Sequence, residues 1–352
     1  MFKDHLKLKL NANLSNENNR FADGVEGGAI RFDPTKPVYD ANSAYGGFFQ
    51  YTDANGVALN GVNRNPVAAL LQRKNITEVN RIFGNFELDY KFHFFEDMRA
   101  VVNVGWDKSK GSGSNELSKE SPDGQRNGNT TSILTNGSFT EFTSERENTL
   151  LDAYLVYSKS LENFRAEVTG GYSYQKFTGS SFSSKDYRRY NDAGNQNNYY
   201  TETDVVLVGF FGRANLTFNE KYLVTLSYRR DGTSRFSEDN RWGNFPAAAI
   251  AWKIKDESFL KDSKTFSDLK LRAGWGITGQ QDGIGDYAYI GNYFQGATTA
   301  QYAFGGQYYQ VLRPAGFDAN LKWETTTSYN LGLDFGFKND RFSGSVDVYQ
   351  KD

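Results

Sequence analysis

The gaps between amphipathic β-strand patterns in this chain alternate between very short and very long. A barrel inserted into a membrane from one side keeps short turns at one end and long polar loops at the other. A soluble β-sandwich has no physical reason to sort its loops in this way. The pattern therefore predicts a bacterial outer-membrane barrel with short periplasmic turns and long extracellular loops. The short gaps are 93–97, 159–163, 219–221 and 338–340, and the long gaps are 15–79, 108–146, 177–204 and 279–322.

About eleven segments show the alternation of apolar and polar residues that is typical of β-strands. In the second segment, for example, Phe86 and Leu88 alternate with Glu87 and Asp89. Charged residues within the strand cores keep to one parity, as expected where the other face meets lipid. The segments lie near 5–14, 80–92, 98–107, 148–157, 164–175, 205–218, 222–229, 244–254, 268–278, 323–337 and 341–350.

The length of these segments favours a membrane barrel. Each runs to about ten residues or more, whereas soluble strands usually have about five or six, and about ten tilted residues cross a bilayer. Large plugged outer-membrane transporters close with about 22 strands. The predicted fold is therefore all-β: a partial antiparallel transmembrane β-barrel with about 11 of about 22 strands. Because the chain begins and ends within strand patterns, we expect residues 1–352 to be a barrel fragment without C-terminal strands or a signal peptide.

Composition excludes several classes of function. The net charge of −2 gives no electrostatic support to nucleic-acid binding. The absence of cysteine excludes disulfides, thiolate metal sites and cysteine nucleophiles. With only His5 and His93, a histidine-dependent triad or zinc site is not expected, and no apolar run is long enough for a transmembrane helix. We expect no enzyme activity, no catalytic residues, no metal and no cofactor.

Aromatic residues gather near the predicted strand ends and in the predicted outer loops. Those at strand ends favour an interfacial girdle over ordinary β-propensity, and they are Trp106, Tyr157, Tyr174, Phe218, Tyr222, Trp252, Phe337 and Phe342. Those in loops either stack on substrate or pack the loops against one another or a lid protein. These candidate substrate-binding residues are Tyr187, Tyr190, Tyr199, Tyr200, Trp242, Tyr287, Tyr293, Tyr308 and Tyr309.

Three loop patterns have a chemical and a structural interpretation. The charges of Arg229–Arg235 could bind an anion, but we expect them to pair with lumen carboxylates and shape the loop. Gly283–Ala288 matches G-x-G-x-x-A without a following helix, which favours loop flexibility over a dinucleotide site. Asp282 and Asp286 could contribute to a calcium site, although acidic pairs in loops are usually solvated. In the longest loop, Asn65 is predicted to cap a short helix that starts at Pro66.

Several stretches resemble the SusC/RagA family of TonB-linked outer-membrane proteins. They occur in the family's order and spread over most of the chain, so the set is specific even though any one piece is weak. The resembling stretches are Lys221–Phe236 continuing through Asn240–Pro246, Leu269–Gln280 and Trp323–Asp334, with weaker matches at Asn80–Tyr90 and Leu151–Tyr154.

This resemblance implies TonB-dependent import of large nutrients, oligosaccharides or peptides, across the cell outer membrane. It also implies a SusD-like surface lipoprotein as a lid, and energy coupling by a TonB–ExbB–ExbD complex through a plug domain that is absent from residues 1–352. The barrel wall would contact outer-membrane lipid. Three alternatives stay open: a non-transporting barrel for surface binding or adhesion, a barrel hydrolase, and a soluble β-sandwich array.

Overall fold

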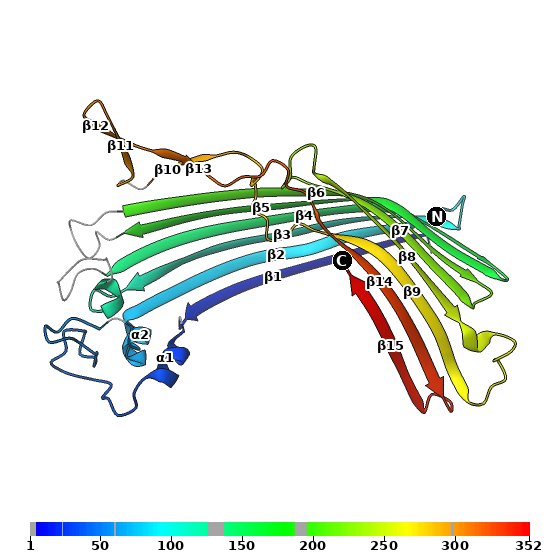
Figure 1. The fold of residues 1–352 in the computed structure, drawn as a ribbon, viewed down its shortest axis with the longest axis horizontal. Helices are drawn as coiled ribbons and strands as arrows, with labels where there is room; N and C mark the ends of the chain where they lie inside the picture. The colour runs from blue at the N-terminus through cyan, green and yellow to red at the C-terminus, as the bar shows by residue number, and fades with distance from the viewer. Residues whose placement is uncertain (1–4, 23, 60, 126–136, 187–195, 297–298) are drawn as a thin grey trace.

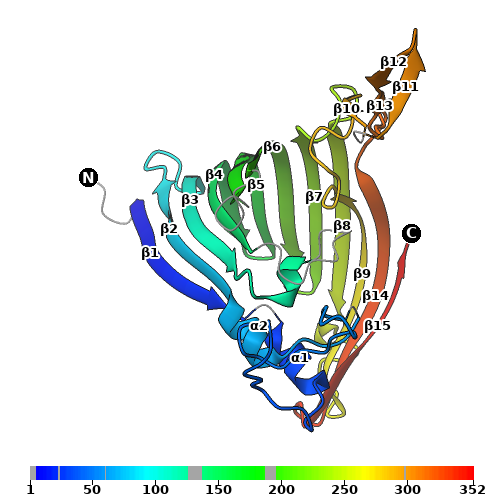
Figure 2. The same ribbon diagram turned by 90° about the vertical axis from the view of Figure 1, so that its left-hand side faces the viewer.

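A computed structural model describes residues 5–22, 24–59, 61–125, 137–186, 196–296 and 299–352. Its main feature is one antiparallel sheet of eleven strands that follow one another in chain order, from β1 to β9 and then β14 and β15. The sheet curves into an open arc rather than a closed barrel (Figures 1 and 2). The predicted strand number and the antiparallel order are confirmed.

The strands differ greatly in length. Those of the wall are β1 (Leu6–Phe21), β2 (Arg73–Lys91), β3 (Met98–Leu117), β4 (Ser138–Leu161), β5 (Phe164–Asp186), β6 (Gln196–Phe218), β7 (Tyr222–Thr233), β8 (Trp242–Lys253), β9 (Phe266–Gln280), β14 (Glu324–Phe337) and β15 (Phe342–Lys351). Two small hairpins interrupt the connection between β9 and β14, with strands β10 (Tyr293–Gln295), β11 (Gln301–Phe304), β12 (Gln307–Gln310) and β13 (Leu312–Pro314).

Helices are few and short. They are α1 (Val25–Arg31), α2 (Pro66–Gln72) and the 3₁₀ turns η1 (Pro122–Gln125) and η2 (Ile254–Asp256). None of the helices in the described residues is long and apolar enough to cross a membrane. Helix α2 starts where the sequence predicts, because the Asn65 side chain accepts hydrogen bonds from the amides of Val67 and Ala68.

The connections are sorted by length between the two ends of the sheet. Short turns at one end join β2 to β3, β4 to β5, β6 to β7 and β14 to β15, and the long connections leave from the other end (Figure 1). In the β6–β7 turn, Asn219 and Glu220 have φ of 48° and 59°, the left-handed conformation that tight hairpins require. The exception is the β8–β9 connection at the short-turn end, residues 254–265, which is longer than the β7–β8 connection at the loop end, residues 234–241. Apart from it, the predicted sorting of turns and loops is present in the fold.

Strands β3 to β6 extend well past the predicted ends on the loop side. They contain 20, 24, 23 and 23 residues, whereas β7 and β8 contain 12 each. The predicted loop 177–204 is wrong at both ends, because β5 continues to Asp186 and β6 starts at Gln196. About ten tilted residues cross a bilayer, so this part of the wall rises beyond the membrane, where neither face needs to be apolar.

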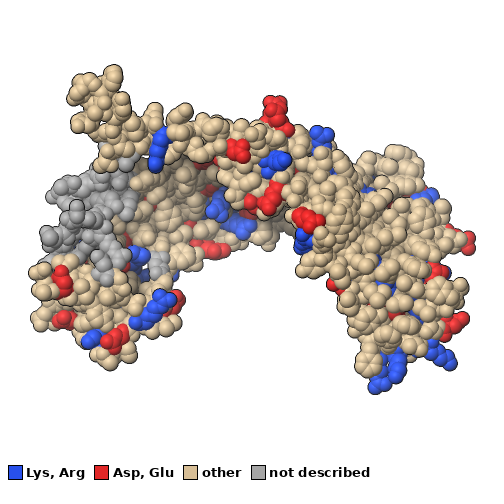
Figure 3. All heavy atoms as spheres, in the orientation of Figure 1, with Lys and Arg blue, Asp and Glu red and all other residues tan. Residues whose placement is uncertain are grey.

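Strand register shows that one face of the sheet is polar. Glu87 lies opposite Asn103, and Asn103 lies opposite Asp152, so these side chains share a face. Cross-strand ion pairs join its charges, including Arg81 with Asp107 and Arg272 with Asp334. This face lines the hollow of the arc (Figure 3), and α1 and α2 lie in the arc's opening (Figure 2).

The opposite face is apolar and points outward. Leu10, Leu331 and Val348 lie on it and keep 69%, 54% and 68% of their surface exposed. A charge on a lipid-facing position costs about 2–4 kcal/mol at the bilayer midplane, which explains why charges avoid this face in the strand cores. All eight predicted girdle aromatics have the outward parity, and cross-strand pairs such as Tyr222 and Trp252 stack with ring centroids 6.4 Å apart.

Candidate functional site

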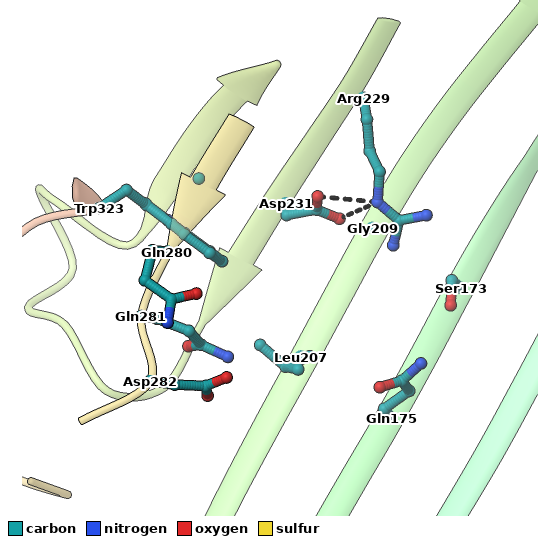
Figure 4. A pocket seen from close by; sticks show the side chains of 11 residues that line it. Ser173, Gln175, Leu207, Gly209, Arg229, Asp231, Gln280, Gln281, Asp282 and Trp323 are labelled. Atoms are coloured by element: carbon teal, nitrogen blue, oxygen red, sulfur yellow. Dashed lines mark hydrogen bonds and ion pairs between the residues drawn. The ribbon is translucent and has the colours of Figure 1, made fainter. Parts of the chain in front are cut away.

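A polar pocket of about 240 Å³ lies on the concave face where the strands meet the long loops. Strands β5, β6 and β7 form its floor, and the end of β9 together with both ends of the β9–β14 connection forms its opposite side (Figure 4). The lining residues are Ser173, Gln175, Leu207, Gly209, Arg229, Asp231, Gly279, Gln280, Gln281, Asp282 and Trp323.

An ion pair forms the floor of the pocket. The Nε of Arg229 donates to both carboxylate oxygens of Asp231 at 2.7 Å. The pair lies over Gly209, and a Cβ there would overlap the Asp231 carboxylate and lie 2.5 Å from Nη2 of Arg229. Gly209 is therefore the residue that leaves room for the pair, and the predicted pairing of Arg229 with a lumen carboxylate is confirmed.

Trp323 forms the opposite side and is held rigidly. Its Nε1 donates to the carbonyl of Arg241 at 3.0 Å. Its ring makes edge contacts with Phe236 and Phe245, at centroid distances of 5.8 and 5.3 Å. Because Phe236 is completely buried, this aromatic cluster fixes the loop above the strands.

Gln281 gives the pocket an unused acceptor. Its Oε1 is buried and has no hydrogen-bond partner within the described part of the chain. Buried polar atoms in native proteins are nearly always paired, so an unpaired one needs an explanation. Gln281 lines the pocket, but its Oε1 is closed to solvent, so a hydroxyl or amide N–H in the pocket bonds to it only after the side-chain amide turns toward the cavity. The volume admits one sugar ring or one amino-acid side chain, because pockets for whole drug-sized ligands are larger, about 300–1,000 Å³.

Three of the predicted loop aromatics lie on strands of the wall. Tyr199 and Tyr200 are on the extension of β6, and Trp242 is the first residue of β8, so their placement in loops is wrong. The polar sequence around the two tyrosines hides their strand, as it hides the loop-side ends of β5 and β6. Tyr199 has the inward parity and Tyr200 the outward parity, while Trp242 leans outward over Gly232.

Four other predicted aromatics lie in the β9–β14 connection. Tyr287 is in a turn, Tyr293 is on β10, and Tyr308 and Tyr309 are on β12. The four side chains are 44%, 71%, 73% and 52% exposed, and none lines the pocket. The hairpins β10–β13 and β11–β12 form a projection, here called the arm, that extends beyond the arc (Figures 1 and 2). Tyr187 and Tyr190 lie outside the described residues.

The acidic pair of the same connection is neutralised by arginine. The Nε of Arg235 lies 3.0 Å from Asp286 Oδ1, and its Nη1 lies 3.5 Å from Asp282 Oδ1. This explains the second half of the Arg229–Arg235 pattern, whose charges hold loop segments together. Within the described ranges, no cluster of three or more potential metal ligands occurs. Gly283 has φ of 86° and begins no helix, as expected for a loop rather than a dinucleotide site.

Among the pocket residues, Arg229, Asp231 and Asp282 lie in patterns that the sequence pointed out, whereas the others were not predicted to form a site. Gln175 and Ser173 have the inward parity of β5, and Gln281 directly follows β9. Their parity was a usable signal, because it assigns the side chains to the lumen. Nothing in the sequence indicates that these side chains meet in one pocket, because the whole arm separates Gln281 from Trp323.

Comparison with known proteins places the chain in a family. The TonB dependent receptor-like, beta-barrel family matches residues 11–352. The TonB-dependent receptor SusC of Bacteroides thetaiotaomicron is 39% identical over 99% of this chain, which corresponds to 36% of SusC. The TonB-dependent receptor P26 of Formosa agariphila is 30% identical over 92% of the chain and 32% of P26. The chain thus spans about a third of the length of these curated relatives.

Solved structures share the fold. A structure of the RagAB peptide importer in its closed-closed state aligns over 99% of this chain and 38% of that chain, with a TM-score of 0.72 and 19% identity. The ferric-catecholate import receptor Fiu from E. coli aligns over 99% of this chain and 49% of that chain, with a TM-score of 0.51 and 9% identity. At identities this low, the similarity to these structures shows a shared fold and nothing more.

The sequence match, the sorted loops and the outward apolar face agree on one assignment, and they confirm the predicted resemblance and the outer-membrane location. The chain belongs to the family of TonB-dependent receptor-like β-barrels of the outer membrane, within its SusC-like members.

Proposed function

We propose that the intact protein imports large nutrients, oligosaccharides or peptides, across the outer membrane in a TonB-dependent manner. The observation that carries the proposal is the similarity to SusC over almost the whole chain. The concave polar wall supports it physically, because a wet lumen lined by charged and amide side chains lets a polar solute pass. Transport of this kind needs no catalytic residue, and the relatives named above are receptors and importers.

The pocket serves in this proposal as a subsite for one unit of the substrate. Once its side-chain amide turns into the cavity, Gln281 accepts a hydrogen bond from a hydroxyl or amide, and Gln175 and Asp282 offer further polar contacts. Trp323 closes one side with an aromatic surface, which can pack against a sugar ring or an apolar side chain. A subsite of this size holds one residue of an oligomer and leaves the rest in the open lumen.

A SusD-like lipoprotein would cover the loop end, and the arm is the proposed place of contact. Tyr293, Tyr302, Phe304 and Tyr308 of the arm are 71%, 62%, 68% and 73% exposed. Exposed aromatic clusters of this kind are typical of protein interfaces. Energy would come from a TonB–ExbB–ExbD complex that acts on a plug domain, which lies outside residues 1–352.

Uptake by cells tests the proposal. Cells with and without the full-length gene would receive fluorescent oligosaccharides or peptides of defined length, with or without a protonophore. Import predicts periplasmic accumulation that requires both the gene and the proton gradient. Gene-dependent attachment to the cell surface without accumulation, and without any effect of the protonophore, would favour the adhesion alternative.

The subsite predicts the effect of one substitution. Gln281→Ala removes the free acceptor, and one lost hydrogen bond of about 0.5–1.5 kcal/mol corresponds to a roughly two- to tenfold higher KM for uptake. The control is Asn330→Ala, which removes an inward-facing amide of β14 outside the pocket. Equal effects of both substitutions, or no effect of Gln281→Ala, would remove the pocket from the transport path.

A further inference from the structure

The outward face of the wall changes its chemistry along the strands. Beyond Trp106 on β3, the outward positions become charged, and each cation has a carboxylate partner on the next strand. The pairs are Lys108 with Glu147 at 3.1 Å, Lys110 with Glu145 at 2.8 Å and Lys176 with Asp204 at 3.0 Å. Since charges are excluded from the hydrocarbon region, this change marks the outer edge of the membrane on the protein surface.

Arg230 is an outward cation of a different kind. It lies on β7 opposite Phe210 and Asn244, and its side chain is exposed. Within the described part of the chain, neither a carboxylate nor any other hydrogen-bond acceptor contacts its guanidinium, in contrast to the paired lysines. Among the described residues, its guanidinium contacts the ring of Trp242, with the guanidinium carbon 5.2 Å from the ring centroid.

The backbone of Arg230 lies just inside the outer edge of the apolar band, so its side chain can reach the headgroup region. Arg230 is eight residues from Tyr222 at the short-turn end of β7, so it lies about 26 Å along the strand. With the strand tilt of about 40° usual in such barrels, this corresponds to a height of about 20 Å in an apolar band of about 25 Å. Trp242 lies one pair further toward the loop end, opposite Gly232, so the side chain extends toward the outer surface of the membrane.

The surroundings of Arg230 combine a fixed cation with an apolar surface. Trp242 also stacks on Phe210, with ring centroids 6.3 Å apart and an interplanar angle of 29°, so the guanidinium lies on an aromatic shelf. Leu226 and Ile250 lie below it on the same face and are 48% and 52% exposed. The Trp242 ring covers one face of the guanidinium and leaves its N–H groups free in the guanidinium plane. Two parallel N–H groups of a guanidinium match two oxygens of a phosphate.

We propose that Arg230, seated on Trp242, binds the phosphate of an outer-leaflet lipid whose acyl chains cover Leu226 and Ile250. Directly below the cation, the Tyr228 hydroxyl donates to Asn244 Oδ1 at 2.8 Å, and the exposed side chains of Leu226 and Ile250 follow. The apolar side chains on this outward face are the reason to assign a lipid rather than free phosphate. The site is independent of the lumen pocket, because Arg230 and the pocket residue Arg229 are neighbours on β7 and point to opposite faces.

Native mass spectrometry of the full-length receptor tests the site, with dioleoyl phosphatidic acid as the probe and dioleoylglycerol as the phosphate-free comparison. Arg230→Gln removes a charge-assisted hydrogen bond of the kind that changes binding about tenfold, so we expect about tenfold weaker retention of phosphatidic acid. Arg230→Lys, which keeps the charge without the fork, should lie between. The control Lys176→Gln removes an outward cation that already has a carboxylate partner and should retain the lipid as the parent does.

Four outcomes would overturn the proposal. The first is equal retention of phosphatidic acid by the parent and by Arg230→Gln, and the second is equal retention of the two lipids by the parent. The third is displacement of the lipid by inorganic phosphate alone. The fourth is a change of oligomeric state in Arg230→Gln without any loss of lipid. The last result would assign the face to a protein partner. A heat-dependent gel shift of each variant confirms that it has folded before the lipids are compared.

Discussion

Asn65 organises the first long loop from within. The residue has no exposed surface. Its side-chain oxygen caps α2, and its Nδ2 donates to the carbonyls of Val38 and Phe49 at 2.7 and 3.2 Å. One amide thus joins the helix to two distant points of the loop. Tyr45, which is 2% exposed, gives the loop a small core, and its hydroxyl donates to the carbonyl of Gly56 and accepts from the amide of Ala58.

Substitution of Asn65 should loosen this loop without affecting the barrel. Asn65→Ala removes the cap and both donated bonds and should destabilise the loop by about 1–3 kcal/mol. Asn65→Asp keeps the cap and loses the donor, so its effect should be smaller. Limited proteolysis of the folded receptor would show faster cleavage within residues 24–59 in that order, and equal cleavage of the parent and Asn65→Ala would contradict this account.

Glu257 ties the short-turn end together. It accepts hydrogen bonds from the Tyr222 hydroxyl at 2.6 Å, from Trp252 Nε1 at 3.0 Å and from Lys221 Nζ at 3.1 Å. These donors, the tyrosine hydroxyl foremost, lower the pKa of the carboxyl from 4.5 to about 2. Two of the three belong to the girdle aromatics, so the carboxylate fixes the girdle at this turn.

The pH dependence of stability follows from this lowered pKa. A carboxyl whose pKa is lower in the folded state stabilises the fold fully above about pH 4.5, and the contribution is lost as the pH falls toward 2. Glu257→Gln should therefore lower the melting temperature by a few degrees at pH 7, and the difference from the parent should shrink by pH 2.5. Thermal gel-shift curves at the two pH values measure this, and a difference that does not change with pH would refute it.

At the level of the strands, close approach at Gly84 holds β1, β2 and β3 together. A Cβ at this position would overlap the backbone oxygen of Asn11 on β1 and lie 2.9 Å from Cζ2 of Trp106 on β3. Only glycine lets the neighbouring strand and the tryptophan pack this closely. Gly212, also on the outward face, would bring a Cβ no nearer than 3.9 Å to any neighbour.

These two glycines give a matched comparison. Gly84→Ala forces β1 or Trp106 to move and should destabilise the barrel by about 1–3 kcal/mol. Gly212→Ala adds the same methyl group to open space and should be neutral. Unfolding midpoints in urea, followed by gel shift, would separate the two variants, and similar midpoints would show that the strands adjust freely at Gly84.

The same strands show what the sequence can predict and what it cannot. The ends at Met98, Phe164, Phe218 and Tyr222 are predicted correctly, because the membrane enforces the alternation up to the short turns. The loop-side ends are missed by about ten residues on β3 to β6. There both faces meet water, so stretches such as Ser180–Ser184 carry no alternation although they pair in register.

The pocket was beyond prediction for a related reason. The sequence shows by strand parity which side chains of β5, β6 and β7 face the lumen and form the pocket floor. It does not show that the β9–β14 connection brings Trp323 over this floor. Hydropathy likewise could not distinguish Trp242, which faces lipid, from Trp323, which faces the lumen. Strand register shows that Trp242 faces outward, because it shares its parity with Ile250 and Trp252.

As a whole, the sheet spans the outer membrane with its short turns on the periplasmic side and its long loops outside. Two independent properties support this arrangement: the sorting of connections and the apolar outward face. Both follow from insertion from one side, and the family match agrees with them. Any function in uptake depends on this orientation, because the pocket and the arm must face the medium.

Cysteine labelling of intact cells tests the orientation most directly, since residues 1–352 contain no cysteine. Gln307→Cys places a thiol on the arm, and Glu162→Cys places one in the β4–β5 turn; both positions are exposed. With a membrane-impermeant maleimide, and the parent receptor as background, we predict labelling of Gln307→Cys in intact cells and of Glu162→Cys only after the envelope is opened. Labelling of Glu162→Cys in intact cells, with Gln307→Cys protected, would mean that the barrel has the opposite orientation.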